Sequence, residues 1–255
     1  MQLPAITFDA VTKRYGGTVA IDAVSLEIAT GSFVALVGTS GSGKSTLLKT
    51  INRLVAPDAG RVLLHGQDVA DGPAPALRRR IGYVFQSIGL FPHMTVAENV
   101  AIGLRIAGQD AGGRVEQLLD LVELPRAVAG RMPDALSGGQ RQRVGIARAL
   151  APGAKLLLMD EALGALDPVT RDSLGGAIRA LHDRLGLTTM LVTHDMAEAL
   201  LLADRVLVME RGRIVADASP AELASGSGGA AAQALVAVPW AQAERLRELA
   251  WGRAS

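Results

Sequence analysis

Two hydrophobic patterns alternate along most of this chain. Short runs of mainly apolar residues occupy 33–37, 155–159 and 189–192, which is typical of strands buried on both faces of a sheet. Between these runs, residues 44–55 and 168–185 carry apolar side chains at helical spacing. The alternation predicts an α/β fold with a mostly parallel central sheet. The apolar face of the first helix is predicted to comprise Leu47, Leu48, Ile51, Leu54 and Val55.

The helix predicted at 168–185 has well-marked ends. Asp167 is a good N-cap residue, Pro168 stands at the first helical position, and Gly186 follows the last turn. Gly175 and Gly176 lie inside the helix, where each glycine costs about 1 kcal/mol relative to alanine. The local pattern offers no reason for this pair.

The first third of the chain has a different pattern. Residues 6–8, 24–28 and 61–64 alternate between apolar and polar side chains and have turn residues around them. This period of two predicts antiparallel strands beside the parallel sheet.

A later block contains only helical patterns. Residues 92–135 include the capping-box sequence Thr95-Val96-Ala97-Glu98 and a second helix with Val115 and Leu118 on its apolar face. We therefore predict a helical subdomain, at about residues 88–150, inserted into one α/β domain of residues 1–224. Residues 225–255 are predicted to form a flexible linker over 225–232 and a short amphipathic helix over 241–251.

Composition excludes several classes of protein. The 255 residues are 49% hydrophobic and 20% charged, and 26 Lys and Arg against 25 Asp and Glu give a net charge of +1. This balance argues against disorder and against nucleic-acid binding through bulk charge. The absence of cysteine excludes disulfides and thiolate metal sites. We expect no signal peptide, because residues 1–4 show no basic region followed by an apolar stretch. We expect no membrane span, because the longest uncharged run, 223–243, is interrupted by glycine and proline.

The strand at 33–37 is followed by a phosphate-binding pattern. Residues 38–45 match G-x-x-x-x-G-K-[ST], the P-loop, and a helix follows as the motif requires. Glycines let backbone N–H groups surround a polyphosphate, while Lys44 reaches the phosphates and Ser45 can bind Mg²⁺. The candidate nucleotide-binding residues here are Gly38, Thr39, Ser40, Gly41, Ser42, Gly43, Lys44, Ser45 and Thr46.

Two carboxylates follow the buried strand at 155–159. Asp160 stands where a carboxylate can hold Mg²⁺ in a P-loop protein, and Glu161 beside it can act as general base toward water. Without the P-loop, the same pair would be two ordinary acidic residues at a strand end.

A second candidate anion site opens the helix after residue 137. Ser137 and Gln140 form a capping box, but Gly138 and Gly139 in the first turn also expose backbone N–H groups to an anion. One triphosphate can contact both this turn and the P-loop only if folding brings them together or if two chains meet.

Residues 136–143, Leu-Ser-Gly-Gly-Gln-Arg-Gln-Arg, together with the P-loop and Asp160-Glu161, closely resemble the nucleotide-binding subunits of ABC transporters. The resemblance covers about residues 5–220. It implies ATP and Mg²⁺ as cofactors and a head-to-tail homodimer. Each ATP then lies between the P-loop of one copy and the signature turn, residues 137–140, of the other. Ser137, Gly138, Gly139 and Gln140 would then bind nucleotide in trans.

The resemblance also assigns roles to four single residues. Tyr15 matches the aromatic that stacks on adenine, and Gln86 matches the Q-loop glutamine that touches Mg²⁺ or the water. Asp167 matches the D-loop, and His194 matches the switch histidine that contacts the γ-phosphate. The implied catalytic set is thus Lys44, Gln86, Glu161 and His194, and the implied metal ligands are Ser45, Gln86 and Asp160.

One position departs from the family pattern. In importers of this type, the catalytic glutamate is usually followed by proline and an aromatic residue, whereas Ala162 and Leu163 follow Glu161 here. Loss of the proline frees the backbone after the carboxylate. We expect activity to survive and its rate to be altered.

The segment at 86–99 is similar to that of osmoprotectant importer ATPases, which serve the uptake of glycine betaine, choline or proline-type solutes. This implies a motor subunit at the cytoplasmic face of the membrane, bound to permease subunits and served indirectly by a solute-binding protein. Some relatives of this group carry a C-terminal sensor module, for which residues 225–255 are too few. The alternatives are the ATPase of another small-solute importer, an exporter subunit, an ABC ATPase outside transport, or a small-molecule kinase.

Overall fold

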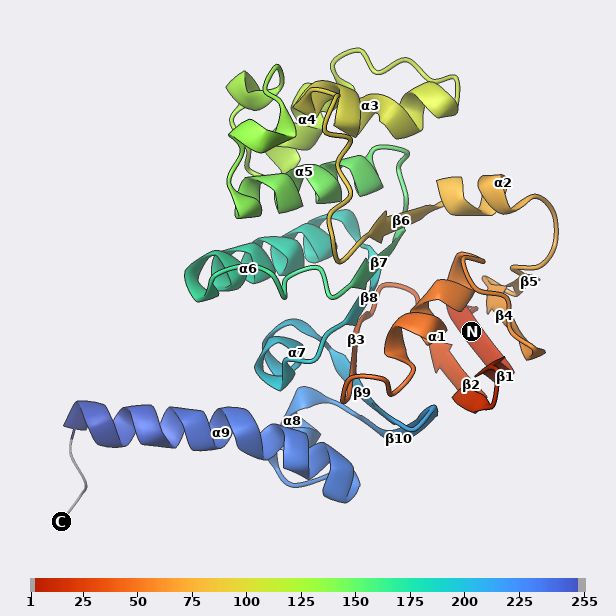
Figure 1. Ribbon diagram of the computed structural model, residues 1–255, viewed down its shortest axis with the longest axis vertical. Helices are drawn as coiled ribbons and strands as arrows, with labels where there is room; N and C mark the ends of the chain where they lie inside the picture. Colours follow the sequence, from red (N-terminus) through yellow and green to blue (C-terminus); the bar gives the residue numbers. More distant parts are fainter. Residues whose placement is uncertain (1–2, 252–255) are drawn as a thin grey trace.

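The computed structural model describes residues 3–251, and within that range the chain forms two β-sheets with helices packed around them (Figure 1). The larger sheet has the strand order β10-β9-β3-β8-β7-β6. Its neighbours pair in parallel, except that β10 runs antiparallel to β9. Its strands are β3 (Phe33–Val37), β6 (Ile81–Val84), β7 (Leu156–Asp160), β8 (Thr188–Val192), β9 (Arg205–Glu210) and β10 (Arg213–Ala218).

The smaller sheet is antiparallel and has the order β2-β1-β4-β5. It confirms the antiparallel strands predicted from the alternating pattern, and the short β5 is an addition. The strands are β1 (Ile6–Tyr15), β2 (Thr18–Ile28), β4 (Ala59–Leu64) and β5 (Gln67–Asp68).

Strand β3 separates two hydrophobic cores, which explains its unbroken apolar sequence. Val34 and Leu36 face a core shared with the smaller sheet and with helix α1 (Lys44–Ile51). Phe33, Ala35 and Val37 face the other core, which the helices from residue 96 onwards cover. Because side chains alternate along a strand, a strand between two cores must be apolar at every position.

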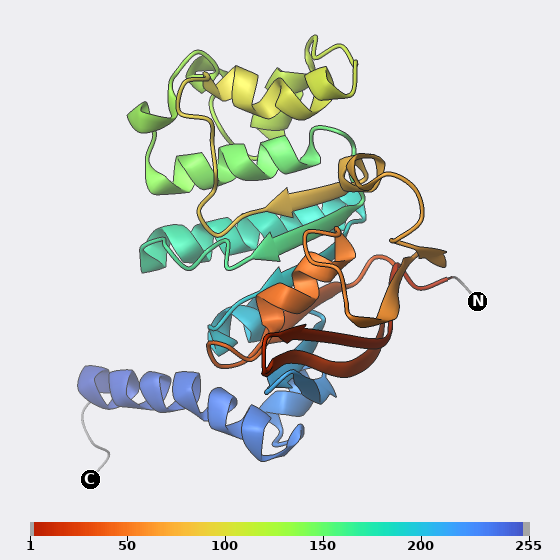
Figure 2. The same cartoon turned by 45° about the vertical axis from the view of Figure 1, so that its right-hand side comes forward.

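Helices α3, α4 and α5 form a layer at one end of the molecule (Figures 1 and 2). This layer corresponds to the helical subdomain predicted from the sequence. No helix within residues 3–251 is long and apolar enough to cross a lipid bilayer. The helices outside α1 and α9 are α2 (Ala74–Arg79), α3 (Val96–Ile106), α4 (Arg114–Leu121), the 3-10 turns η1 (Arg126–Val128) and η2 (Pro133–Ala135), α5 (Gly138–Leu150), α6 (Pro168–Leu185), α7 (Met196–Leu202) and α8 (Pro220–Ala224).

The predicted helix caps are present. Thr95 and Ser137 each form a complete capping box, with Glu98 and Gln140 respectively. The side chain of Asp167 accepts a hydrogen bond from the Thr170 N–H at 3.0 Å. Each cap satisfies N–H groups that the first turn of a helix leaves free.

Two boundaries predicted from sequence are wrong. Helix α1 ends at Ile51, because the next turn places Arg53 in the left-handed region (φ 55°), and Leu54 is therefore exposed instead of buried. The linker expected over 225–232 is shorter than predicted, because a helix begins at Gly229.

Helix α9 (Gly229–Trp251) is continuous and begins inside the segment predicted to be a flexible linker. Its alanines favour helix. Ala232 and Val236 are buried in the main core, the one that Phe33, Ala35 and Val37 face, and their burial holds the first half of α9 in place. Its second half, which includes the predicted helix at 241–251, extends away from the body (Figure 2). Residues 252–255 of the predicted tail lie outside the described range.

The two glycines inside α6 differ in their surroundings. A Cβ at Gly175 would lie 3.3 Å from a methyl group of Leu202 in α7, whereas a Cβ at Gly176 would meet nothing within 4 Å. Gly175 thus permits close packing of α6 and α7, and Gly176 has no such role.

We expect Gly176→Ala to raise the free energy of unfolding by about 0.5–1 kcal/mol, because alanine reduces the conformational entropy lost by the helix. Gly175→Ala should gain less, since its new methyl group presses on Leu202. Urea denaturation of the two variants beside the wild type measures the difference. A loss of stability with Gly176→Ala would contradict the assignment.

Candidate functional site

The candidate catalytic residues gather at the carboxyl ends of neighbouring parallel strands. The P-loop follows β3, Gln86 follows β6, Asp160 ends β7, and His194 follows β8. Ligands of open α/β sheets bind at this edge. The parallel strand order therefore assembles a site from segments that are far apart in the sequence.

Two glycines allow the P-loop to pass between β9 and β2. Gly38 has φ 151°, and a Cβ there would lie 2.2 Å from the carbonyl oxygen of Met209. Gly43 has φ 108°, and its Cβ would lie 2.1 Å from the carbonyl oxygen of Ala20. No side chain fits at either position, so backbone conformation and packing both require glycine.

Lys44 is held inside the loop. Its side chain is 4% exposed, and Nζ donates hydrogen bonds to the carbonyl oxygens of Gly38 at 2.8 Å and Thr39 at 2.9 Å. Burial lowers the pKa of Lys44, while the negative charges of Glu161 and Asp160 oppose that effect. The loop thus presents an ammonium group beside the backbone amides predicted to receive phosphate.

Asp160 is a buried carboxylate with several donors around it. The Ser45 hydroxyl donates to Oδ1 at 2.6 Å, the Tyr83 hydroxyl donates to Oδ2 at 3.1 Å, and the Lys49 ammonium lies 3.2 Å from Oδ2. Burial and the charge of Asp160 both raise the pKa of Tyr83, so its hydroxyl keeps the proton that it donates.

Tyr83 and Lys49 were not predicted as site residues. Lys49 stands four residues after Ser45 on α1, and this helical spacing was a signal that could have indicated it. Tyr83 lies in β6, and only the pairing of β6 with β7 brings it to Asp160.

The side chains predicted as metal ligands have the chemistry that Mg²⁺ prefers. Ser45, Asp160 and Gln86 supply hydroxyl, carboxylate and amide oxygens, which a hard divalent cation prefers. Within residues 3–251, no three His, Asp or Glu side chains cluster closely enough to hold a metal ion by themselves. Mg²⁺ in phosphate sites takes one or two protein carboxylates and completes its shell with phosphate and water, so this donor set fits it.

Glu161 lies at the centre of the candidate catalytic residues. Its Oε2 accepts a hydrogen bond from Gln86 Nε2 at 3.1 Å and lies 3.6 Å from His194 Nδ1. The backbone of Glu161 has φ 48°, an uncommon conformation for a non-glycine residue. Its N–H donates to the Val192 carbonyl at 2.9 Å, which ties the turn to β8.

Ala162 and Leu163, where the family pattern has proline and an aromatic residue, are both buried in the main core. Burial therefore anchors the backbone after Glu161. The altered rate expected from this sequence change remains a prediction.

Tyr15 ends β1 and is 51% exposed, with the Lys13 ammonium 5.6 Å from its ring centre. The turn after Tyr15 leads into β2, and β2 contacts the P-loop through Ala20 and Gly43. The exposed ring thus belongs to an element that adjoins the P-loop, and its stacking on adenine remains a prediction.

The signature turn is not joined to the P-loop within one chain. Ser137 and Gln140 hydrogen-bond to each other's backbone, and α5 lies in the helical layer, apart from α1 (Figure 1). A Cβ at Gly139 would lie 2.5 Å from a methyl group of Thr170, so close packing of α5 against α6 already requires this glycine. Binding of an anion by the N–H groups of residues 138 and 139 stays a prediction.

The ABC transporter family matches residues 21–164 of this chain. The sulfate/thiosulfate import ATP-binding protein CysA of Caulobacter vibrioides is 52% identical over 216 residues, which are 82% of this chain and 63% of that protein. The choline transport ATP-binding protein OpuBA of Bacillus subtilis is 45% identical over 222 residues, 86% of this chain and 58% of that protein. The chain thus spans about three fifths of the length of these relatives.

A solved structure supports the same assignment. The dimeric structure of a post-hydrolysis state of the ATP-binding cassette MJ0796, bound to ADP and Pi, has 34% sequence identity and a TM-score of 0.76. The match covers 84% of this chain and 98% of that one. This chain therefore belongs to the ABC transporter family and has the ABC ATPase fold.

Proposed function

We propose that this chain binds ATP with Mg²⁺ and hydrolyses it, as the motor subunit of an ABC importer. The observation that carries the proposal is the convergence of a P-loop lysine, a buried carboxylate beside Ser45 and a second carboxylate, Glu161, at one sheet edge. Phosphoryl transfer needs this combination of positioning and charge.

The chain's own residues divide the chemistry among them. The P-loop amides and Lys44 bind the phosphates. Ser45, Asp160 and Gln86 would hold Mg²⁺, which would supply neutralising charge to the phosphate oxygens. Glu161 orients a water and accepts its proton as the water oxygen bonds to the γ-phosphorus. The bond between the γ-phosphorus and the bridging oxygen breaks, and ADP leaves. His194 stabilises the negative charge on the γ-phosphate.

The complete site requires two copies of the chain. In this proposal the signature turn, residues 137–140, and Asp167 contact the nucleotide held by the partner's P-loop. The separation of this turn from the P-loop in one chain supports the arrangement, as does the dimeric form of the similar cassette MJ0796.

We expect the rate of ATP hydrolysis to rise faster than linearly with protein concentration, because each site needs two chains. Turnover measured over a hundredfold range of concentration, with sedimentation at the same concentrations, tests this. Strictly linear turnover by a protein that sediments as a monomer would contradict the two-chain site. If the protein is already a dimer at every concentration, mixed dimers of wild-type and variant chains should instead show that each site needs residues of both copies.

The proposed solute class is the osmoprotectants, such as glycine betaine, choline or proline. The proposal rests on the segment 86–99, whose sequence is similar to that of osmoprotectant importer ATPases. Similar proteins named for osmoprotectant transport include OpuBA and the glycine betaine uptake system ATP-binding protein YehX of Escherichia coli, which is 46% identical over 84% of this chain. The 52% identity to CysA favours sulfate as the second candidate.

The same segment is proposed to contact the permease at the cytoplasmic face of the membrane, with a solute-binding protein delivering the solute. Phe85 and Phe91 flank the Gln86 loop and are 43% and 40% exposed, so they offer apolar contact area there. Uptake of labelled glycine betaine and of labelled sulfate, in cells that contain the chain with its permease, decides between the two solutes.

A further inference from the structure

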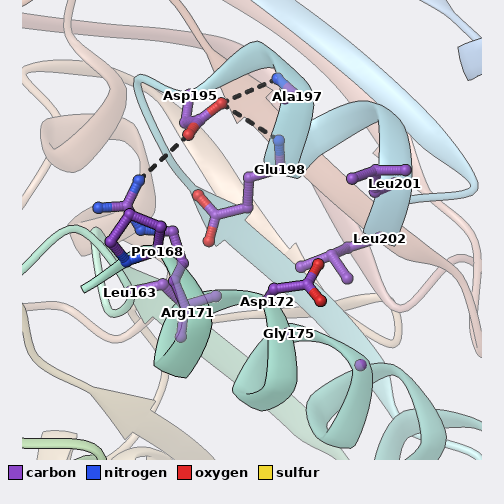
Figure 3. A pocket seen from close by; sticks show the side chains of 11 residues that line it. Leu163, Pro168, Arg171, Asp172, Gly175, Asp195, Ala197, Glu198, Leu201 and Leu202 are labelled. Carbon is purple, nitrogen blue, oxygen red and sulfur yellow. Dashed lines mark hydrogen bonds and ion pairs between the residues drawn. The ribbon is translucent and has the colours of Figure 1, made fainter. Parts of the chain in front are cut away.

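One arginine joins two short segments next to Glu161, and Figure 3 shows its contact with Asp195. The first segment, the turn at residues 164–167, ends at the proposed D-loop residue Asp167. The second, residues 193–195, carries His194. Arg171, in the first turns of α6, donates from Nη2 to the carbonyl oxygens of Leu166 at 3.0 Å and Gly164 at 3.5 Å. Its Nη1 lies 3.4 Å from Asp195 Oδ2.

Asp195 is itself firmly positioned. Its Oδ1 accepts hydrogen bonds from the N–H groups of Ala197 at 2.9 Å and Glu198 at 3.3 Å, so it caps α7. Its own N–H donates to the Thr193 hydroxyl at 3.0 Å, and that hydroxyl donates to the Glu198 carboxyl group. Arg171 therefore binds Asp195 at the start of α7 through Nη1. Through Nη2 it binds the carbonyl oxygens of the 164–167 turn.

We propose that Arg171 is a positioning residue that couples the 164–167 turn to the His194 loop, so that contact of a second copy with the turn is transmitted to His194. The inference rests on the proposed function, because it assigns the turn to the contact between two copies. Arg171 touches neither nucleotide nor water in this role and acts through the two segments.

The planar guanidinium is the group that suits this task. It donates in two directions at once, whereas an ammonium group on a lysine stem lacks the fixed fork that reaches both partners. The Nε of Arg171 and Oε1 of Glu198 are buried and have no partner among the described residues. A loss of either guanidinium contact therefore leaves further buried polar atoms unpaired.

The space behind this link leaves room for the guanidinium and the 164–167 turn to move. Arg171, Asp195, Glu198 and Leu201 border a cleft of about 450 Å³ between α6 and α7 (Figure 3). Gly176 also lines it without a side chain to fill it. Because no packed core fills this space, the guanidinium can shift together with the turn when the turn is displaced.

Arg171→Lys is expected to lower kcat for ATP hydrolysis about tenfold and to change KM for ATP less than twofold, because small misplacement of catalytic groups slows chemistry while the P-loop is untouched. The Hill coefficient for ATP should fall toward one. Steady-state kinetics at several protein concentrations give all three values.

Arg179→Lys is the matched control. Arg179 lies two turns farther along α6, and its side chain is also 31% exposed. It bridges Asp183, Asp204 and the Leu202 carbonyl, away from Glu161. This variant should lower the melting temperature and keep kcat within twofold of the wild-type value.

A kcat for Arg171→Lys within twofold of the wild-type value would overturn the proposal. Equal losses of kcat in Arg171→Lys and Arg179→Lys, in proportion to the loss of folded protein, would also overturn it. In a Glu161→Gln background, Arg171→Lys should keep the ATP-dependent dimer. Loss of that dimer would make Arg171 only a support of the interface and would also overturn the coupling. Failure of the proposed function is distinguishable, because the wild-type chain would then show no turnover at all.

Discussion

A Glu161→Gln variant is expected to keep its affinity for ATP and to lose turnover by a factor on the order of a hundred to a thousand. The amide keeps the size of the side chain, and its oxygen can still accept the hydrogen bond that Gln86 now donates to the carboxylate. It cannot accept a proton from water. Binding and chemistry should therefore separate, and the variant should accumulate as an ATP-bound dimer.

Equilibrium binding of a fluorescent ATP analogue and a phosphate-release assay measure the two effects. Glu27→Gln, at an exposed position of β2, is the control and should change neither value. Undiminished turnover in the Glu161→Gln variant would remove Glu161 from the role of general base. A joint loss of affinity and turnover would instead indicate that the carboxylate helps to bind nucleotide.

A Lys44→Ala variant is expected to bind ATP on the order of a hundredfold more weakly. Hydrogen bonds to charged groups contribute about 1.5–3 kcal/mol each, and this ammonium is the buried cation of the P-loop. Its removal also leaves the carbonyl oxygens of Gly38 and Thr39 without their donor. The loop would then lose both its cation and part of its internal support.

Lys44→Met controls for the lost side-chain volume, because methionine fills the space without a charge or a donor, and it should lose the same affinity. Lys155→Ala is the control, since Lys155 lies at the start of β7, at the opposite edge of the sheet, and its ammonium donates to the Leu185 carbonyl. Titration calorimetry with ATP and Mg²⁺ gives the affinities. Wild-type affinity in both Lys44 variants would mean that this loop is not the nucleotide site.

The sequence by itself determined the local parts of the site and of the fold. The P-loop, the strand that ends in Asp160 and the caps at Thr95, Ser137 and Asp167 are encoded in consecutive residues, since each depends on backbone conformation and on side chains within one turn. The antiparallel strands near the N-terminus followed from their period of two for the same reason.

The ends of two helices escaped prediction because distant contacts decide them. Arg53 ends α1 in a left-handed turn, where its carbonyl oxygen accepts a hydrogen bond from Arg78 Nη2 at 2.8 Å, although apolar residues continue in the helical period. Residues 229–232 belong to α9 although their composition suggests a linker, because the core formed by earlier elements buries Ala232.

Only the tertiary structure decided which side chains meet at the site. Ser45 and Asp160 are 115 residues apart, and the pairing order of β3, β8 and β7 brings them to hydrogen-bond distance. Tyr83 reaches Asp160, and Arg171 reaches Asp195, through the same arrangement of strands and helices. Periodicity and motifs describe neighbours along the chain, whereas these contacts depend on how the two cores pack the strands and helices against one another.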